Sequence, residues 1–225
     1  MNFEGMNFMK QSYKIDRLNL ITYKHQKKKH LQSINSRYIA KSHIVNCLAV
    51  NQSFKYVNYR GSIITKVKFN NVFFYGCDFW GTSFNKCEFR NISFDNCIFM
   101  ACKFKNCEFI NCNFSFTTIV NTNLSFCQGI DISSGVFYYR TYPNINVNEE
   151  LKNALDVIKY DFNLRKNKLL FISEYKYNKL NLYLLQKKFK EELPDVLIEL
   201  KNHSTKNITT YKKLELVLYK FKNMI

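Results

Sequence analysis

The sequence predicts a β-solenoid over residues 50–129, followed by a small all-α domain over residues 147–225. Two observations carry this prediction. In the first region large apolar residues recur every five positions, and small and turn-forming residues keep the same step. In the second region the apolar residues change to helical spacing. A sustained internal repeat of this kind indicates a solenoid.

The large apolar residues define the first phase of the repeat. Neither a helix, with about 3.6 residues per turn, nor a flat strand, with a period of about two, places every fifth residue on one side. The chain must therefore change direction once in each unit. Fifteen consecutive units carry such a residue: Phe54, Tyr59, Ile64, Phe69, Phe74, Phe79, Phe84, Phe89, Phe94, Phe99, Phe104, Phe109, Phe114, Ile119 and Leu124.

The cysteines lie in a second phase, two positions before each large residue. All eight cysteines of the chain fall in it: Cys47, Cys77, Cys87, Cys97, Cys102, Cys107, Cys112 and Cys127. A third phase, two positions after the large residue, is rich in Gly and Asn, as at Gly61, Asn71 and Gly76. These residues tolerate positive φ or close a turn with their own side chains. Each unit is thus a short extended segment followed by a corner.

Five stretches show the repeat most clearly: CDFWG, CEFRN, CKFKN, CEFIN and CNFSF. They resemble the pentapeptide-repeat family, whose consensus is A(D/N)LXX, and the resemblance covers roughly residues 52–129. In that family four pentapeptides form each coil of a right-handed, four-sided (quadrilateral) β-helix, so the resemblance implies about four coils here. This chain departs from the consensus in having Phe in place of Leu and Cys in place of Ala.

Twenty residues per coil would stack residues twenty apart in four inward ladders, with coils one strand spacing apart. The ladders expected are Phe54–Phe74–Phe94–Phe114, Tyr59–Phe79–Phe99–Ile119, Ile64–Phe84–Phe104–Leu124 and Phe69–Phe89–Phe109. The predicted structural core comprises Phe74, Phe79, Phe84, Phe89, Phe94, Phe99, Phe104, Phe109 and Phe114, with Cys77, Cys87, Cys97, Cys102, Cys107 and Cys112.

The evenly spaced cysteines raise the alternatives of a zinc site, disulfides or core packing. Zinc would need four thiolates around one ion, in space that the phenylalanine rings are expected to occupy. Stacked pairs such as Cys87 and Cys107 lie at a spacing that strains a disulfide. We therefore expect core packing, in which a buried thiol acts as a small hydrophobe, with no metal and no cofactor.

Residues 1–49 are expected to form an N-terminal cap with a basic segment. Lys27, Lys28 and Lys29 belong to a Lys/His cluster that is either a phosphate- or acid-binding patch or a solvated loop, and they are candidate partner-binding residues. The stretch SRYIAKSHIVNCLAV is either a strand or an imperfect first coil in phase with Cys47.

Residues 130–146 are expected to form a closing loop and linker, in which VFYYRTYPNI supplies aromatic residues that close the last coil. Beyond them about four helices are predicted. They begin after Asn148, span 169–190, open at Pro194 and start at Thr209 or Thr210.

The last predicted helix carries Lys212 and Lys213. A basic amphipathic helix either binds a partner or is a surface helix with one face toward the core. These two lysines are the second group of candidate partner-binding residues.

Composition and sequence motifs limit the classes of function that we expect for this chain. The chain has a net charge of +17, which attracts nucleic acid, acidic lipid or acidic protein. No apolar run reaches the ~18 residues of a membrane span, and the N-terminus lacks the apolar segment of a secretory signal, so we expect a cytoplasmic protein without membrane contact. No nucleotide-binding, nucleophile-elbow or metalloprotease motif appears, so we expect no catalytic residues and no enzyme activity.

These observations favour a non-catalytic interaction protein, a rigid rod with a helical module that binds a protein partner, with an effector or immunity factor as a special case. One alternative follows from the resemblance: quinolone-resistance members dimerise, mimic DNA and bind type II topoisomerases. That mimicry needs an acidic surface, whereas residues 50–129 hold eight Lys/Arg and only four Asp/Glu. Direct nucleic-acid binding by the basic ends is a further hypothesis. A homodimer is compatible with each of them.

Overall fold

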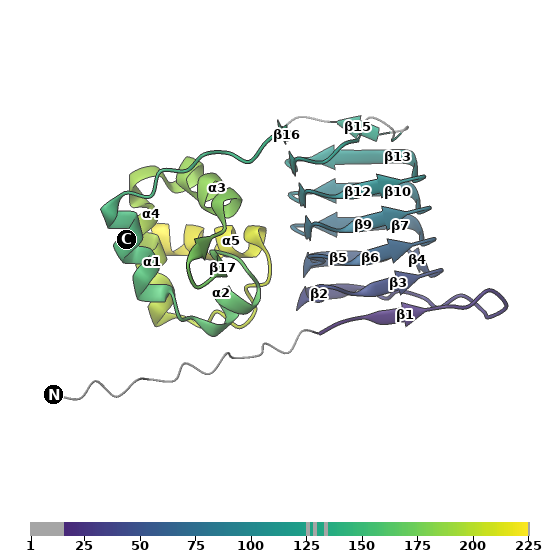
Figure 1. The fold of residues 1–225 in the computed structure, drawn as a ribbon, viewed down its shortest axis with the longest axis horizontal. Helices are drawn as coiled ribbons and strands as arrows, with labels where there is room; N and C mark the ends of the chain where they lie inside the picture. The colour runs from purple at the N-terminus through teal and green to yellow at the C-terminus, as the bar shows by residue number, and fades with distance from the viewer. Residues whose placement is uncertain (1–15, 125–126, 128–129, 133–134, 225) are drawn as a thin grey trace.

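The computed structural model describes residues 16–124, 127, 130–132 and 135–224. The protein is a β-solenoid of about six turns followed by a helical C-terminal region. Figure 1 shows the strands stacked in successive layers, with the helical region against one side of the stack. The predicted fold class is confirmed, and the solenoid has more coils than the four expected.

Successive coils pair in parallel with a register of twenty residues. Phe89 lies opposite Phe69 in one neighbouring coil and opposite Phe109 in the other. The ring centroids of these two pairs are 5.1 and 4.7 Å apart. Such stacked rings add a favourable interaction to the apolar area that they bury. The register confirms the prediction that residues twenty apart form ladders.

We number the faces of the solenoid 1 to 4 by a residue in the central ladder of each: Phe94, Phe79, Phe84 and Phe89. Face 3 is formed by β1 (Asn19–Ile21), β3 (His43–Val45), β6 (Ile63–Thr65), β9 (Ser83–Asn85) and β12 (Lys103–Lys105). Face 4 begins with β4 (Leu48–Val50), and three long strands run from face 4 into face 1: β7 (Lys68–Tyr75), β10 (Glu88–Asp95) and β13 (Glu108–Ser115). Face 1 also holds β2 (Ile34–Tyr38), β5 (Ser53–Asn58) and β15 (Ile130–Ile132). Face 2 is formed by β8 (Asp78–Trp80), β11 (Ile98–Met100), β14 (Thr118–Val120) and β16 (Phe137–Tyr139).

The corners have the positive-φ backbone conformation that the Gly and Asn residues of the third phase predict. Asn71, Gly76 and Gly81 adopt φ values of 52°, 58° and 63°. At the corner between faces 4 and 1 the asparagines also form a side-chain ladder, because Asn91 donates to Asn71 at 2.9 Å and Asn111 donates to Asn91 at 3.2 Å. Asn therefore serves there both as a residue that tolerates positive φ and as a link between coils.

The solenoid begins upstream of residue 50, where the sequence placed its boundary. Strand β2 pairs with β5 and β3 with β6, each with a register of twenty residues. The large-residue phase continues through this segment as Ile34, Ile39, Ile44 and Ala49. The coil count was underestimated because these units lack the phenylalanine of the later ones. At the other end β16 pairs with β14, so residues 137–139 close the last coil as expected.

The first coil is longer than the others, because Asn19 pairs with His43, 24 residues away. The added residues form a loop between Thr22 and His30. In Figure 1 this loop follows β1 and projects from the solenoid on the side away from the helical region.

The helical region contains α1 (Glu149–Ile158), α2 (Phe162–Lys166), α3 (Lys179–Phe189), α4 (Leu193–Ile198) and α5 (Tyr211–Lys222), with the hairpin β17 (Phe171–Ser173) and β18 (Lys176–Tyr177) and the 3-10 turns η1 (Lys190–Glu192) and η2 (Glu199–Asn202). The expected starts at Asn148 and Thr210 are confirmed, since their side chains accept from the backbone N–H of Leu151 and Lys213. The prediction of one helix over 169–190 was wrong in its first half. The hairpin occupies residues 171–177, and the helix starts only after the capping residue Asn178.

The protein has two hydrophobic cores. One fills the solenoid. The other joins the helical region to Ile98, Met100 and Val120, whose side chains point outward from face 2. The helical region therefore covers face 2 with a continuous apolar contact. In the described ranges, no helix combines the length and apolar character that crossing a membrane requires.

Candidate interaction surfaces

The residues predicted for the core line the inside of the solenoid. The central phenylalanines from Phe74 to Phe114 are buried, except Phe104, which is half-buried on face 3. Of the predicted core cysteines, Cys77, Cys87, Cys97, Cys102 and Cys112 are buried and Cys107 is half-buried.

The buried thiols donate to carbonyl groups of the preceding coil, as Cys112 does to Phe89 at 3.3 Å. Burial raises the pKa of the Cys97 thiol well above its ordinary value and that of Cys102 to about 12. Cys107 differs, because a hydrogen bond with the Cys87 thiol lowers its pKa to about 7. A protonated buried thiol is neither a nucleophile nor a metal ligand. Within the described part of the chain, no three His, Cys, Asp or Glu side chains gather where they could hold a metal ion.

Hydrogen bonds fix the start of α5 to face 2. The Asn58 side-chain amide donates to the carbonyl of Thr209 at 3.0 Å, and the Thr209 hydroxyl donates to the carbonyl of Tyr56 at 2.6 Å. In the next coil Asp78 lies beside Asn58 and accepts from the backbone N–H of Tyr211 at 3.0 Å. Two successive coils thus hold the N-terminus of one helix.

Asp78 is a buried carboxyl group. Burial raises its pKa from 3.8 to about 7, although the hydrogen bond from Tyr211 and the charge of Arg60 act in the opposite direction. The Arg60 guanidinium lies 3.5 Å from the centre of the Trp80 ring. The cation–π contact of Arg60 with Trp80 lies within the solenoid, whereas Asp78 joins the solenoid to the start of α5.

The sequence contains a pattern that indicates the contact between face 2 and the helical region, and our prediction did not use it. Outward positions on the other faces are mostly polar, whereas face 2 presents Trp80, Ile98, Met100 and Val120. These residues occur in every fourth pentapeptide, so they gather on one face only once the chain is folded into four-sided coils.

Lys212 and Lys213, predicted as partner-binding residues, lie against the solenoid. The Lys212 side chain is only 15% exposed and pairs with Glu215 at 2.9 Å. The Lys213 ammonium lies 4.7 Å from the centre of the Tyr56 ring. Both lysines therefore serve contacts within the protein, because the first turn of α5 lies against the solenoid.

Lys27, Lys28 and Lys29 lie in the loop between Thr22 and His30. Lys27 and Lys29 are exposed and Lys28 is half-buried. Since this loop projects away from the helical region, the structure does not bring the two predicted groups of lysines together (Figure 1).

A cavity of about 320 Å³ opens where the last coil meets the helical region, and we call it the seam pocket. Ile98, Phe116 and Phe137 line its solenoid wall, and Lys187 and Lys188 come from α3. Its volume and its place between two structural units are typical of binding sites.

Glu215 of α5 also lines the seam pocket and is almost fully buried. Its carboxylate lies 3.2 Å from the Lys188 ammonium and 2.9 Å from that of Lys212. Two cations thus share one carboxylate, which leaves this wall with an excess of positive charge.

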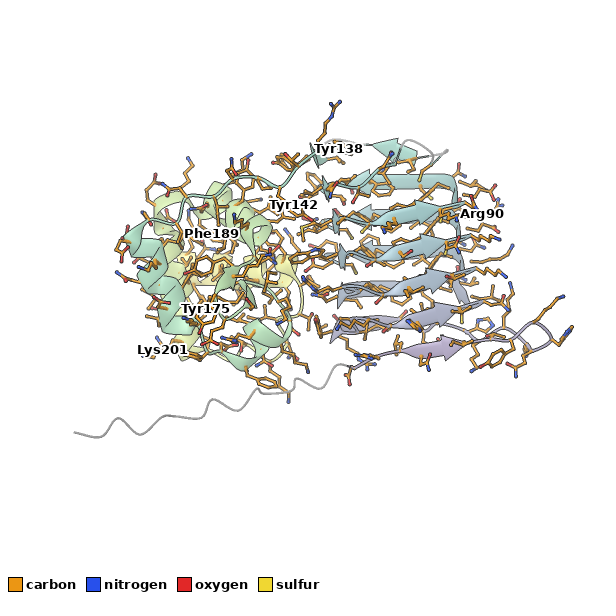
Figure 2. The ribbon with its side chains drawn as sticks, viewed as in Figure 1. Arg90, Tyr138, Tyr142, Tyr175, Phe189 and Lys201 are labelled. Carbon is orange, nitrogen blue, oxygen red and sulfur yellow. The ribbon has the colours of Figure 1, made fainter. Side chains whose placement is uncertain are left out.

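Aromatic side chains are exposed at the same end of the solenoid. Phe116, Phe137 and Tyr138, which we call the aromatic end, are 60%, 51% and 54% exposed. Tyr138 continues the face 2 ladder beyond Ile119, and Figure 2 shows it at the end of the stack of strands. Exposed aromatic groups beside a pocket are typical of interaction sites.

Comparisons with known proteins support our interpretation of the five-residue period as a pentapeptide repeat. Two family models, both described as pentapeptide repeats, match residues 54–108 and 97–128. No curated protein matches the chain.

Three solved structures illustrate the similarity. The pentapeptide repeat protein Rfr23 from the cyanobacterium Cyanothece 51142 is 10% identical, with a TM-score of 0.24, over 45% of this chain and 63% of its own, slightly less than two thirds. A trypsin-treated variant of QnrB1, a plasmid-mediated fluoroquinolone resistance protein, is 13% identical with a TM-score of 0.23, over 49% of this chain and 91% of its own. Full-length QnrB1 is 9% identical with a TM-score of 0.17, over 56% of this chain and 94% of its own. The two family matches together span residues 54–128, about a third of the chain, and the twenty-residue register of the strands agrees with the pentapeptide repeats that they describe.

Proposed function

We propose that this protein is a non-catalytic interaction protein whose aromatic end and seam pocket receive a segment of a protein partner. One observation carries the proposal: Phe116 and Phe137 are largely exposed and flank a cavity of about 320 Å³. Aromatic side chains around a pocket are the groups that contribute most binding energy in protein interfaces. The solenoid beneath them is already ordered, so little entropy is lost on binding.

The walls of the seam pocket indicate the chemistry of the partner. The solenoid side is mostly apolar, with Asn96 and Thr118 as its polar residues, and Lys187 and Lys188 line the opposite side. A complementary segment would insert an aromatic or aliphatic side chain and carry a carboxylate next to it. We therefore expect an acidic segment with an apolar anchor.

The chemistry of the interior supports a non-catalytic role. The buried thiols of the repeat face the core and hold their protons, as the raised pKa values of Cys97 and Cys102 indicate. Asp78 and Glu215, the buried carboxyl groups described above, are engaged by Tyr211 and by two lysines. Each of these groups has a structural partner within the protein.

Partner capture with the full chain tests the proposal. Proteins cross-linked to the wild type would be identified, and the affinity of the purified partner would be measured for Phe137→Ser and Lys187→Glu. We expect each variant to bind at least tenfold more weakly. Tyr175→Ser is the matched control, since Tyr175 is 89% exposed but lies on the helical region away from the solenoid (Figure 2).

Equal binding by Phe137→Ser and the wild type would contradict the proposed surface. Sedimentation of the same variants separates a second possibility. If the wild type is a dimer and Phe137→Ser is a monomer, the aromatic end is a contact between two copies of this chain, and the partner assignment is wrong.

A further inference from the structure

We infer that one edge of the solenoid binds the phosphate backbone of a nucleic-acid strand. The edge lies between faces 3 and 4, away from the seam pocket. This inference is independent of the function proposed above, and different residues carry it.

Three lysines from successive coils form this basic edge: Lys66, Lys86 and Lys105. Lys66 and Lys86 occupy the corner itself, with φ values of 54° and 53°, and Lys105 ends β12 beside the same corner, whereas Lys103 begins that strand at the far side of face 3. The backbone N–H of Lys86 donates to the carbonyl of Lys105 at 2.8 Å, which fixes these residues in adjacent coils. All four side chains are exposed. The repeat therefore sets the charges of Lys66, Lys86 and Lys105 in a row parallel to the solenoid axis, with Lys103 beside this row on face 3.

The long loop of the first coil extends this row. Its base is tied to the same corner, because Thr22 donates through its N–H to Val45 at 3.0 Å and accepts from the Asn46 side chain at 3.2 Å. The loop between Thr22 and His30 carries Lys24, Lys27, Lys28 and Lys29, and we call it the basic loop. The sequence marked three of these lysines as candidates, and the structure brings their loop to the same edge as lysines 37 to 78 residues further along the chain.

Carboxylates do not interrupt the row. The strands of face 3 contain no Asp or Glu. The nearest strands of face 4 contain Glu88, which pairs with Lys68 at 2.7 Å and with Arg90 at 3.6 Å, and the exposed Glu108 at the start of β13. Figure 2 shows Arg90 on the side opposite the helical region. Face 4 is thus partly neutralised, and the uncompensated charge lies on the edge and on face 3.

The shape of this surface favours a nucleic-acid strand as its ligand. From β1 to β12 there are four coil steps, which at about 4.8 Å each give a row roughly 19 Å long. A row of this length can contact several consecutive phosphates of one strand. Between the lysines lie small polar residues such as Thr65 and Asn85, which leave the backbone of a ligand room to approach. Tyr23 in the loop is 68% exposed and offers a ring on which a base can stack.

Binding of the full chain to a fluorescent 20-nucleotide oligothymidine, measured by anisotropy from 50 to 300 mM salt, tests the inference. Two triple variants are compared with the wild type: Lys66→Gln/Lys86→Gln/Lys105→Gln on the edge and Lys27→Gln/Lys28→Gln/Lys29→Gln in the loop. Each is expected to weaken binding at least tenfold near 0.1 M salt. Each should also reduce the slope of log K against log salt by about two, since a single-strand phosphate contact contributes about 0.7.

The matched control is Lys201→Gln/Lys206→Gln/Lys220→Gln, which removes the same charge from exposed positions of the helical region. It should change the affinity less than twofold. An equal loss in the control, a salt-independent affinity, or binding to phosphatidylserine vesicles in place of the oligonucleotide would overturn the inference. Thermal unfolding of each variant verifies that it is folded. If Phe137→Ser no longer binds the protein partner, its affinity for the oligonucleotide should still equal that of the wild type. Each proposal can therefore be disproved without affecting the other.

Discussion

The carboxylate of Asp78, on face 2 of the solenoid, accepts a hydrogen bond at 3.0 Å from the backbone N–H of Tyr211, the first residue of α5. The two residues are 133 positions apart. A carboxylate at a helix start satisfies a free N–H group and interacts favourably with the helix dipole. The helix thus has a cap from its own Thr210 and a second one from the solenoid, which couples helix formation to docking.

This contact makes stability depend on pH. Because burial raises the pKa of Asp78 from 3.8 to about 7, the folded protein keeps a proton between these pH values that the unfolded chain has lost. Stability from this group is therefore greatest below its ordinary pKa and falls as the pH rises to about 7, by up to about 4 kcal/mol. Asp78→Asn should remove this decline, because the amide oxygen still accepts from Tyr211 without carrying a charge. Urea unfolding at pH 5 and pH 8 measures the effect, with exposed Asp156→Asn as the control. An unchanged decline in Asp78→Asn would show that another group titrates.

The position of this contact illustrates what the sequence could and could not predict. The period of five fixes which side chains point inward, and the coil of four pentapeptides implied by the family resemblance stacks Phe89 on Phe109. The same period predicts corners at residues such as Asn71, because only a few residue types tolerate positive φ. The docking of the helical region was not predicted, because the outward apolar residues that mark face 2 recur only in every fourth pentapeptide and gather on one face only in the folded coils.

Two errors have simpler causes. The upstream coils were left outside the predicted solenoid, and an imperfect coil in phase with Cys47 was offered only as an alternative, because Ile39 and Ile44 keep the phase of the repeat without its characteristic phenylalanine. The hairpin at 171–177 was assigned to a helix because a short apolar run fits either structure. The seam pocket and the basic edge lie between residues from several coils, so the folded register was needed to find them.

A buried hydroxyl inside the solenoid leads to a second prediction. Tyr59 is fully buried, and its hydroxyl has no hydrogen-bond partner among the residues that the structure describes. The next two rings of its ladder are Phe79 and Phe99. An unpaired buried hydroxyl costs about 1–3 kcal/mol, so Tyr59→Phe should raise the free energy of unfolding by about 1 kcal/mol. Thermal and urea unfolding measure this, and exposed Tyr175→Phe should have no effect. A loss of stability would instead reveal a partner for the hydroxyl.

The cysteines lead to a third prediction. Cys102 lies in a column with Thr82 and Thr122, and all three donate to a carbonyl 23 residues earlier. Threonine therefore already fits the environment on either side of Cys102. Cys102→Thr should change the free energy of unfolding by less than about 0.5 kcal/mol, whereas Cys102→Leu should overpack the coil and cost about 1–3 kcal/mol. A large loss for the threonine variant, accompanied by release of a metal ion, would show that the thiols are ligands and not core packing.

Phe116 leads to the last prediction, which concerns a conflict between stability and binding. It stands at the corner that Gly76 and Asn96 occupy in earlier coils, and all three have positive φ. A bulky residue rarely adopts this conformation, and such backbone strain costs on the order of 1–3 kcal/mol. The ring regains part of this by packing on Gly135, yet it remains 60% exposed.

Phe116→Asn should therefore stabilise the fold by about 1 kcal/mol and weaken partner binding at least tenfold. Phe116→Ala is the control, since it removes the ring but keeps a residue that tolerates positive φ less well than asparagine. It should lose the same binding without the same gain in stability. A stabilised Phe116→Asn that binds as the wild type does would mean that the ring is not part of the partner surface. If binding is lost while stability rises, the strain at this corner is retained because the exposed ring contacts the partner.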